Sequence, residues 1–120
     1  MASELRVDTL KDSSGNNSVG MAYVAGGSAK AWYKSSSAIV FSGTFNIASG
    51  VDNGTGNYTF NFTNSMADTD YTTPCGCQSG NDRGTTLSAL ATGSITMESY
   101  NYAGTNTDAS TMASVHGDLA

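Results

Sequence analysis

The chain of 120 residues is short enough for one domain, and a formal net charge of −5 with 12% charged residues excludes a highly charged disordered chain. Ser, Thr, Asn and Gly make up nearly half of the sequence, whereas Ile, Leu, Val and Phe make up fewer than one residue in six. That composition excludes an ordinary monomeric enzyme with a thick aliphatic core. The five Lys and Arg residues form no basic patch, so nucleic-acid binding is not expected. We expect a folded, turn-rich chain that is stabilised in part by copies of itself.

The N-terminal region has neither a basic stretch followed by an apolar run nor a membrane-spanning segment of about 18 apolar residues. We therefore expect a protein that is made and folded in a cytosol and does not enter a membrane. An alternation of apolar residues begins at Leu5 and continues to Leu10, which predicts an extended segment. The polar residues Lys11–Ser18 predict a loop after it.

A β-hairpin is predicted next. Residues 19–24 have the alternation of a strand, with Met21 and Tyr23 on one face. The pair Gly26-Gly27 predicts a turn, and residues 29–34 predict the returning strand.

The longest apolar stretch of the chain is Ala38–Ile47. Phe41, Phe45 and Ile47 share parity within it, so we expect all three side chains on one side of a strand. The sequence Asp52-Asn53-Gly54-Thr55-Gly56 then predicts a turn, because Asn and Gly accept positive φ angles.

The clearest strand signal is the strict alternation over Asn57–Thr63, in which Tyr58, Phe60 and Phe62 face one way. We expect this strand to pair with Phe41–Ile47 through aromatic cross-strand contacts. Side chains expected in the core or in a trimer contact are Trp32, Phe41, Phe45, Ile47, Tyr58, Phe60 and Phe62.

The last third of the chain predicts further short strands. Residues 68–74 predict a turn that leads into a short edge strand, and Pro74, which cannot donate to a β-ladder, marks an edge or a strand end. Residues 79–84 predict a loop, Leu87–Tyr102 one long or two short strands, and Met112–Leu119 a final strand. Seven or so short strands predict an all-β fold: a single compact antiparallel sandwich or barrel-like module.

Candidate chemical groups are sparse. His116 is the single histidine and would have to be the base of any nucleophilic site, but no nucleophile-elbow motif accompanies it. Asp68 and Asp70 are the best local carboxylate pair, and their turn-like surroundings favour backbone hydrogen bonding instead. Cys75 and Cys77 are too close for an unstrained bridge and cannot complete a zinc site, which leaves reduced thiols, an inter-chain bridge or a redox role. We expect no enzyme activity, no metal and no cofactor.

A contact with sugars is a further possibility for exposed aromatic rings. Tyr100 and Tyr102 share one strand face, with the amide of Asn101 on the other. We predict these two tyrosines as a receptor or glycan contact, because ring faces pack well against the C–H groups of sugars.

Several segments of the sequence resemble segments of a module of bacteriophage tail fibres and related virion proteins, and they follow one another in the same order as in that module. Many of these proteins come from phages of aquatic bacteria. The matching segments span residues 4–71. One of them is Val51–Thr63, which contains the most specific run, Asp52-Asn53-Gly54-Thr55-Gly56-Asn57-Tyr58-Thr59. The others are Leu5–Asn16, Ala29-Lys30-Ala31-Trp32, Phe45-Asn46-Ile47-Ala48-Ser49 and Met66-Ala67-Asp68-Thr69-Asp70-Tyr71. Lys34–Ser37 and Pro74–Cys77 depart from the pattern, and the C-terminal third has no match.

The resemblance implies a homotrimer that is exposed on the virion and assembled in the host cytoplasm. Residues 1–18 would attach the chain to other virion proteins, and residues 19–120 would form the β-module. The expected function is that of a short tail fibre or adhesin-like subunit that binds the host surface. Two alternatives stay open: a capsid decoration (cement) protein that stabilises the capsid lattice, and a stand-alone carbohydrate-binding domain.

Overall fold

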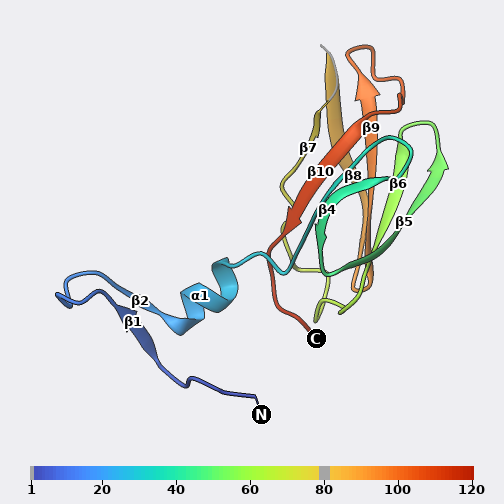
Figure 1. Cartoon of the computed structure of the whole chain (residues 1–120). Coiled ribbons are helices and arrows are strands. Elements are labelled where there is room, and N and C mark those ends of the chain that lie inside the picture. Colours follow the sequence, from blue (N-terminus) through green and yellow to red (C-terminus); the bar gives the residue numbers. More distant parts are fainter. Residues whose placement is uncertain (1, 79–81) are drawn as a thin grey trace.

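The computed structural model describes residues 2–78 and 82–120, which form a β-sandwich and an N-terminal arm that projects from it (Figure 1). The molecule measures 52 × 31 × 25 Å. Eight of the described strands build two four-stranded antiparallel sheets, and the other two form a small hairpin in the arm. The prediction of a compact all-β module is confirmed.

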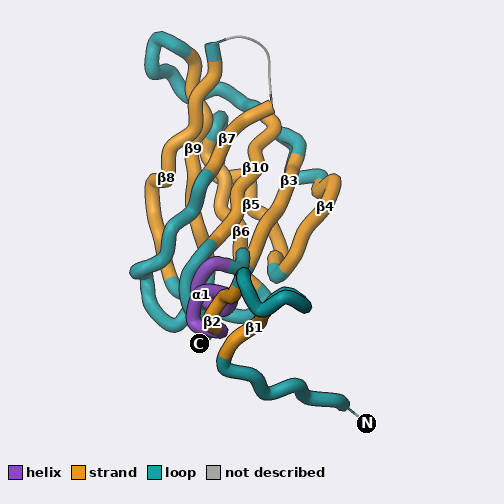
Figure 2. The backbone as a smooth tube through the Cα atoms, turned by 90° about the vertical axis from the view of Figure 1, so that its left-hand side faces the viewer, coloured by secondary structure: helices purple, strands orange, loops and turns teal. Residues whose placement is uncertain are grey.

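Each sheet of the sandwich has one central pair of strands and two edges. The first, called here the β3 sheet, has the order β4 (Phe41–Phe45), β3 (Ala31–Ser35), β10 (Ser110–Val115) and β7 (Cys75–Gln78). The second, the β6 sheet, has the order β5 (Ile47–Gly54), β6 (Asn57–Phe62), β9 (Ser94–Asn101) and β8 (Arg83–Ala91). Figure 2 shows the strands of the β3 sheet side by side. β7 follows Pro74 and is an edge strand, as its proline predicts.

The core between the sheets uses tyrosine and methionine where most proteins use aliphatic residues. The ring of Tyr33 stacks on Phe60 with centroids 3.8 Å apart, and its hydroxyl meets Thr111 Oγ1 at 3.1 Å and the sulfur of Met97. The buried cluster comprises Ala31, Tyr33, Tyr58, Phe60, Phe62, Met66, Tyr71, Ile95, Met97, Ala113 and Val115. One chain thus closes its own core, so the low count of Ile, Leu, Val and Phe does not by itself require copies of the chain.

β6 confirms the strand predicted from strict alternation. Tyr58, Phe60 and Phe62 are buried, and the intervening side chains point outward. The hydroxyl of Tyr58 donates to Asp108 Oδ1 (3.1 Å) and accepts from the buried N–H of Ala109 (3.3 Å). Burial raises the pKa of Tyr58, and the hydrogen bond to the Asp108 carboxylate acts in the same direction.

The expectation of one strand over residues 41–47 is wrong. Asn46 adopts a left-handed φ of 57° and ends β4, so that β5 starts in the other sheet. Its amide donates to the carbonyls of Lys30 and Asn64 (both 3.0 Å), which stabilises a corner between the two sheets. A β-bulge between β3 and β4 also breaks the parity of β4. As a result Phe41 packs against the core, whereas Phe45 lies on the outer face with 54% of its surface exposed.

The pairing predicted between β6 and Phe41–Ile47 is also wrong, because the corner at Asn46 divides that stretch between the two sheets. The neighbour of β6 is Ile47–Gly54, and Phe41–Phe45 belongs to the other sheet. The aromatic contact between Phe41 and Phe60 still forms, at 6.0 Å between centroids, but it crosses the sandwich instead of joining two paired strands.

The hairpin predicted over residues 19–34 is also wrong. β2 (Ser18–Gly20) ends early and pairs with β1 (Thr9–Lys11) around the predicted polar loop. Residues 21–27 form the helix α1 in place of the predicted strand and turn. The arm in the structure includes α1 and continues to the start of β3 (Figure 1).

The predictions for the last third of the chain agree in part with the structure. Leu87–Tyr102 resolves into two strands, β8 and β9, which is one of the two alternatives. β10 ends at Val115, and Leu119 forms an isolated bridge with Met66. Of the predicted loop over 79–84, residues 79–81 lie outside the described residues, while Arg83 and Gly84 belong to β8.

Candidate interaction surfaces

The two outer faces of the sandwich differ in chemistry. The outer face of the β6 sheet carries a ladder of polar side chains that bond to one another across the strands. Asn57 Nδ2 donates to Glu98 (3.0 Å), and Thr59 and Thr96 share a hydrogen bond of 2.9 Å. Asn61 donates to Ser49 Oγ at 3.1 Å. This face has the polar pattern of a solvated surface.

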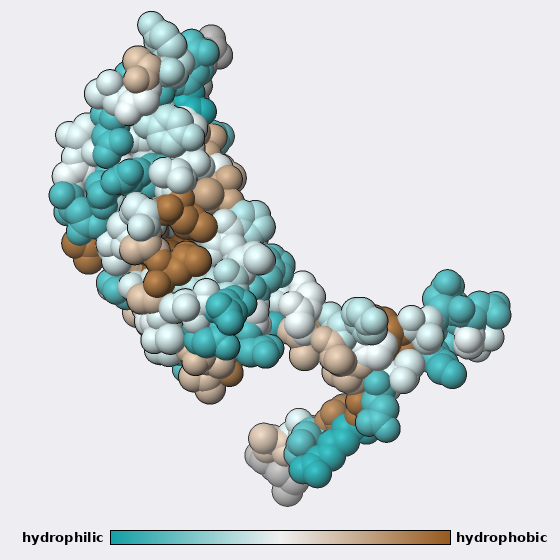
Figure 3. Space-filling model, turned by 180° about the vertical axis from the view of Figure 1, so that it is seen from behind, coloured by the Kyte–Doolittle hydropathy of each residue, from teal (hydrophilic) through white to brown (hydrophobic). Residues whose placement is uncertain are grey.

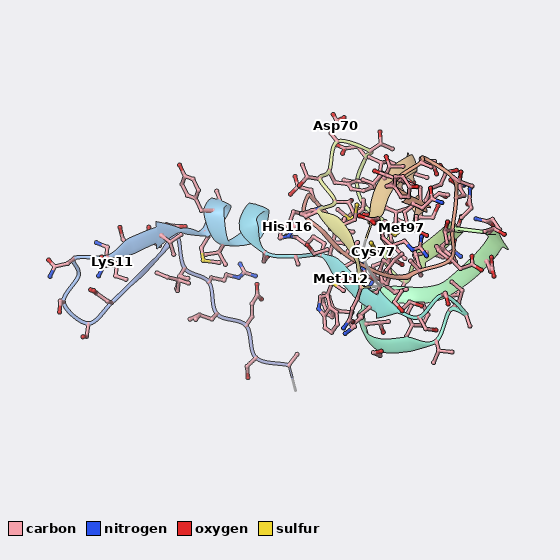
Figure 4. All side chains as sticks on the ribbon, turned by 90° about the horizontal axis from the view of Figure 1, so that it is seen from above. Lys11, Asp70, Cys77, Met97, Met112 and His116 are labelled. Atoms are coloured by element: carbon pink, nitrogen blue, oxygen red, sulfur yellow. The ribbon has the colours of Figure 1, made fainter. Side chains whose placement is uncertain are left out.

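The outer face of the β3 sheet carries exposed aromatic and other apolar side chains beside two polar ones. We call it the aromatic face: Trp32, Lys34, Phe45, Pro74, Met112 and Ser114. Trp32 lies directly opposite Phe45 in the ladder, and 43% of the Trp32 surface is exposed. A hollow of about 500 Å³ lies on this face, and Trp32, Met112 of β10 and Pro74 are among the residues that line it. Figure 4, seen from above, shows Met112 on this outer side of the sandwich. Contiguous exposed apolar residues of this kind mark interaction sites.

A glycine fixes the position of the Trp32 ring. A Cβ on Gly43 would lie 3.1 and 3.3 Å from two carbons of the indole, so the ring covers the backbone of β4. Because β4 is an edge strand, the ring extends to the border of the sheet. Part of the Trp32 side chain is therefore packed, and the exposed remainder is accessible to a partner.

The arm (residues 2–30) is the second exposed apolar surface. Leu5 exposes 81% of its surface and Tyr23 79%, and α1 buries no residue. Figure 3, which views the molecule from behind, shows hydrophobic atoms at the surface of the arm. Residues 4–8 alternate strictly between charged and apolar side chains, and Arg6 pairs with Glu4 at 2.9 Å on the charged side.

Tyr100 and Tyr102, the predicted glycan contact, lie together at one end of the sandwich. They line a small hollow of about 220 Å³ with Asp82, Arg83 and Gly84. Tyr102 follows the end of β9 and is 86% exposed. The ring of Tyr100 covers Gly84, where an added Cβ would approach it to 2.6 Å, so this ring has a structural role on the edge strand β8.

His116 links the sandwich to the arm. Its Nδ1 lies 3.2 Å from the carbonyl oxygen of Gly27 at the end of α1, and its Nε2 lies 3.2 Å from Ser114 Oγ. Figure 4 shows His116 where the arm enters the sandwich, with Lys11 far out along the arm. Ser114 and His116 are two positions apart on one strand side, which explains their contact without a catalytic arrangement.

The other candidate groups do not converge. Asp70 lies on an exposed loop away from His116 (Figure 4), and the Asp68 carboxylate accepts from the N–H of Asp70 (2.8 Å) as a turn residue. Cys75 and Cys77 are free thiols on β7, and the Cys75 sulfur accepts a bond from Thr85 at 3.5 Å. Within residues 2–78 and 82–120, no three His, Cys, Asp or Glu side chains gather as metal ligands. The same part of the chain contains no helix with the length and hydropathy of a membrane span.

The aromatic face escaped the sequence reasoning, although a signal for it exists. Trp32 shares its parity with Lys34, and the alternate residues Ala31, Tyr33 and Ser35 are the buried ones. A lysine indicates the solvent side of a strand, so the pattern predicts an exposed Trp32. Sequence reasoning placed it in the core or in a trimer contact; it is not in the core of its own chain.

Comparison with known proteins adds no assignment: the chain matches no protein-family model, no curated protein and no solved structure.

Proposed function

We propose that the protein is a non-enzymatic structural subunit of a bacteriophage virion: a homotrimeric short tail fibre or adhesin that attaches through its arm. The observation that supports this most is the arm itself. A hairpin of two three-residue strands and a helix of seven residues are both too short to be stable alone. Side chains such as Leu5, Val7 and Tyr23 therefore need an apolar surface on another molecule. A subunit of a larger assembly has such a surface.

The separation of the two parts of the molecule fits this role. The arm joins neighbouring subunits of the virion, and the sandwich is exposed to the host. Tyr100 and Tyr102 lie at an end of the sandwich and supply the contact to a host-surface glycan. Three copies would add weak contacts through their effective concentration.

The proposal is tested by locating the chain in purified virions and counting its copies. Quantitative mass spectrometry of purified particles is expected to find the chain in tens of copies, in the tail fraction after the capsid is removed. Absence from the particle contradicts the proposal.

A capsid decoration protein is the second candidate, because an arm that leaves the body at one point is also suited to clamp neighbouring capsid subunits. Hundreds of copies in the capsid fraction would assign this role in place of the tail role.

The stand-alone carbohydrate-binding domain is the third candidate. Glycan-array binding of the chain is expected to be lost with Tyr102→Ala, whose side chain is exposed and supports nothing else. Val51→Ala, on the β6 sheet, is the control. Binding that survives Tyr102→Ala contradicts the assignment of this site.

A further inference from the structure

We propose that residues 4–8 of one copy add as a fifth strand to β4 of a neighbouring copy, with Leu5 and Val7 packed against Phe45 and Trp32. This inference rests on the homo-oligomer of the proposed function and names the surface that makes it. Two features of the chain carry it: an amphipathic strand without a sheet, and a sheet edge with an uncovered apolar border.

The segment has the pattern of a strand. Its charged residues, Glu4, Arg6 and Asp8, alternate with Leu5 and Val7, and it has no strand partner in the described chain. The ion pair between Glu4 and Arg6 places the charges on one side and leaves the apolar residues on the other. A half-apolar strand is stable when a sheet edge satisfies its backbone and an apolar surface covers one side.

β4 offers both. In the described structure it pairs with β3 and has no strand on its other side. Its outward residues are Phe45 and Gly43, and the indole of Trp32 covers Gly43. A strand beside β4 would place one apolar side chain against the Phe45 ring and the next, two residues on, against the Trp32 ring. Leu5 and Val7 have this spacing, and both β4 and the segment are five residues long.

Charge opposes contact between two sandwiches but does not oppose contact between the arm and a sandwich. Residues 1–30 hold three acidic and three basic residues, whereas residues 31–120 hold seven acidic residues against two basic ones. Two sandwiches therefore repel each other, but a neutral arm does not meet this repulsion. The aromatic face has no carboxylate, and it holds Lys34, one of those two basic residues. The charged side of the segment would lie beyond β4 at the rim of the sandwich, in water.

The geometry favours a neighbouring copy over the same chain. The arm leaves the sandwich at the start of β3, and the N-terminal end lies away from β4 in both ribbon views (Figures 1 and 2). Head-to-tail contacts of this kind close into rings when the rotation permits, and a trimer is one such ring.

The first experiment measures the association of the full chain by sedimentation velocity. Leu5→Ser with Val7→Ser is expected to weaken association by about a hundredfold or more, because two apolar side chains lose their burial. Phe45→Lys, tested separately, is also expected to weaken association, because it replaces the ring that they contact with a charged side chain. Val51→Lys, an exposed apolar position on the edge strand of the other sheet, is the matched control and is expected to associate as the wild type does. Leu5, Val7 and Phe45 are surface residues, so the sandwich of each variant folds; circular dichroism checks this.

The second experiment identifies the contact. A photo-crosslinking benzoylphenylalanine replaces Val7, and isotope-labelled and unlabelled chains are mixed. Crosslinks between a labelled and an unlabelled chain at residues 41–45 or Trp32 are expected, and the same probe at Tyr23 is the control.

The outcomes separate the two proposals. A trimer that resists all these substitutions, or that crosslinks elsewhere, overturns the strand addition and leaves the homotrimer intact. Crosslinks to β4 within one chain also overturn it. A wild-type chain that stays monomeric overturns both the strand addition and the trimer.

Discussion

The stacked pair of Phe60 and Tyr33 is expected to hold the two sheets together, and replacing Phe60 by alanine tests this. The Phe60 side chain is fully buried, lies 3.8 Å from the Tyr33 ring centroid and makes an edge contact with Phe41 at 6.0 Å. Loss of a buried phenylalanine costs about 3–5 kcal/mol, including the cavity it leaves. We expect a loss of about 4 kcal/mol in the free energy of unfolding. A domain of this length has roughly 6–18 kcal/mol in total.

Phe45→Ala is the matched control, because it removes the same atoms from the outer face. About half of the Phe45 surface is already in water, so the expected cost is about 1 kcal/mol or less. Urea denaturation monitored by circular dichroism measures both variants, at a protein concentration low enough that the chain is monomeric. Equal costs for the two substitutions would refute the division of this stretch into a buried and an exposed phenylalanine.

Three further predictions concern single positions and pH. Gly56→Ala is expected to lower the free energy of unfolding by about 2–5 kcal/mol, because φ is +62° and a Cβ would clash with the backbone oxygen of Ser99. Gly104→Ala, at φ +78° in open space, is expected to lower it by about 1 kcal/mol, and similar urea midpoints for the two variants would contradict this. Thr73→Val is expected to leave the thermal midpoint unchanged or raise it, because the buried Thr73 hydroxyl has no hydrogen-bond partner among the described residues; a clear fall would show that the hydroxyl is bonded. Burial raises the pKa of three tyrosines in the folded state, so the stability they confer is complete below about pH 10, the pKa of an unfolded tyrosine, and is lost as the pH rises through the higher folded-state values. The urea midpoint should therefore fall above about pH 10, and a constant midpoint there would contradict the burial of these groups: Tyr33, Tyr58 and Tyr71.

Local patterns in this chain predict local structure well. The strict alternation of β6 predicts which of its side chains are buried, and Pro74 predicts the edge strand that follows. Both signals act within a few residues, because the pleat and the missing proline N–H are properties of the backbone itself.

The failures occur where contacts outside a segment, which its own pattern does not contain, decide the outcome. Residues 19–24 have the alternation of a strand, but β2 reaches its partner β1 and ends, and the chain continues as a helix. Asn46 ends a strand in the middle of an apolar stretch because the carbonyls of Lys30 and Asn64 are present to accept its amide.

The composition, the alternation and the turn residues by themselves determined an all-β chain with a polar surface and short strands. Tertiary structure alone decided which strands share a sheet, and therefore that Phe60 is buried while Phe45 and Trp32 form an outer apolar surface. The physical reason is that residue spacing along a strand determines which side chains share one face of that strand. Whether this face meets the other sheet or water depends on how the sheets pack. The bulge in β4 and the corner at Asn46 change which alternate side chains of this stretch point toward the core. Residue spacing alone predicts neither feature.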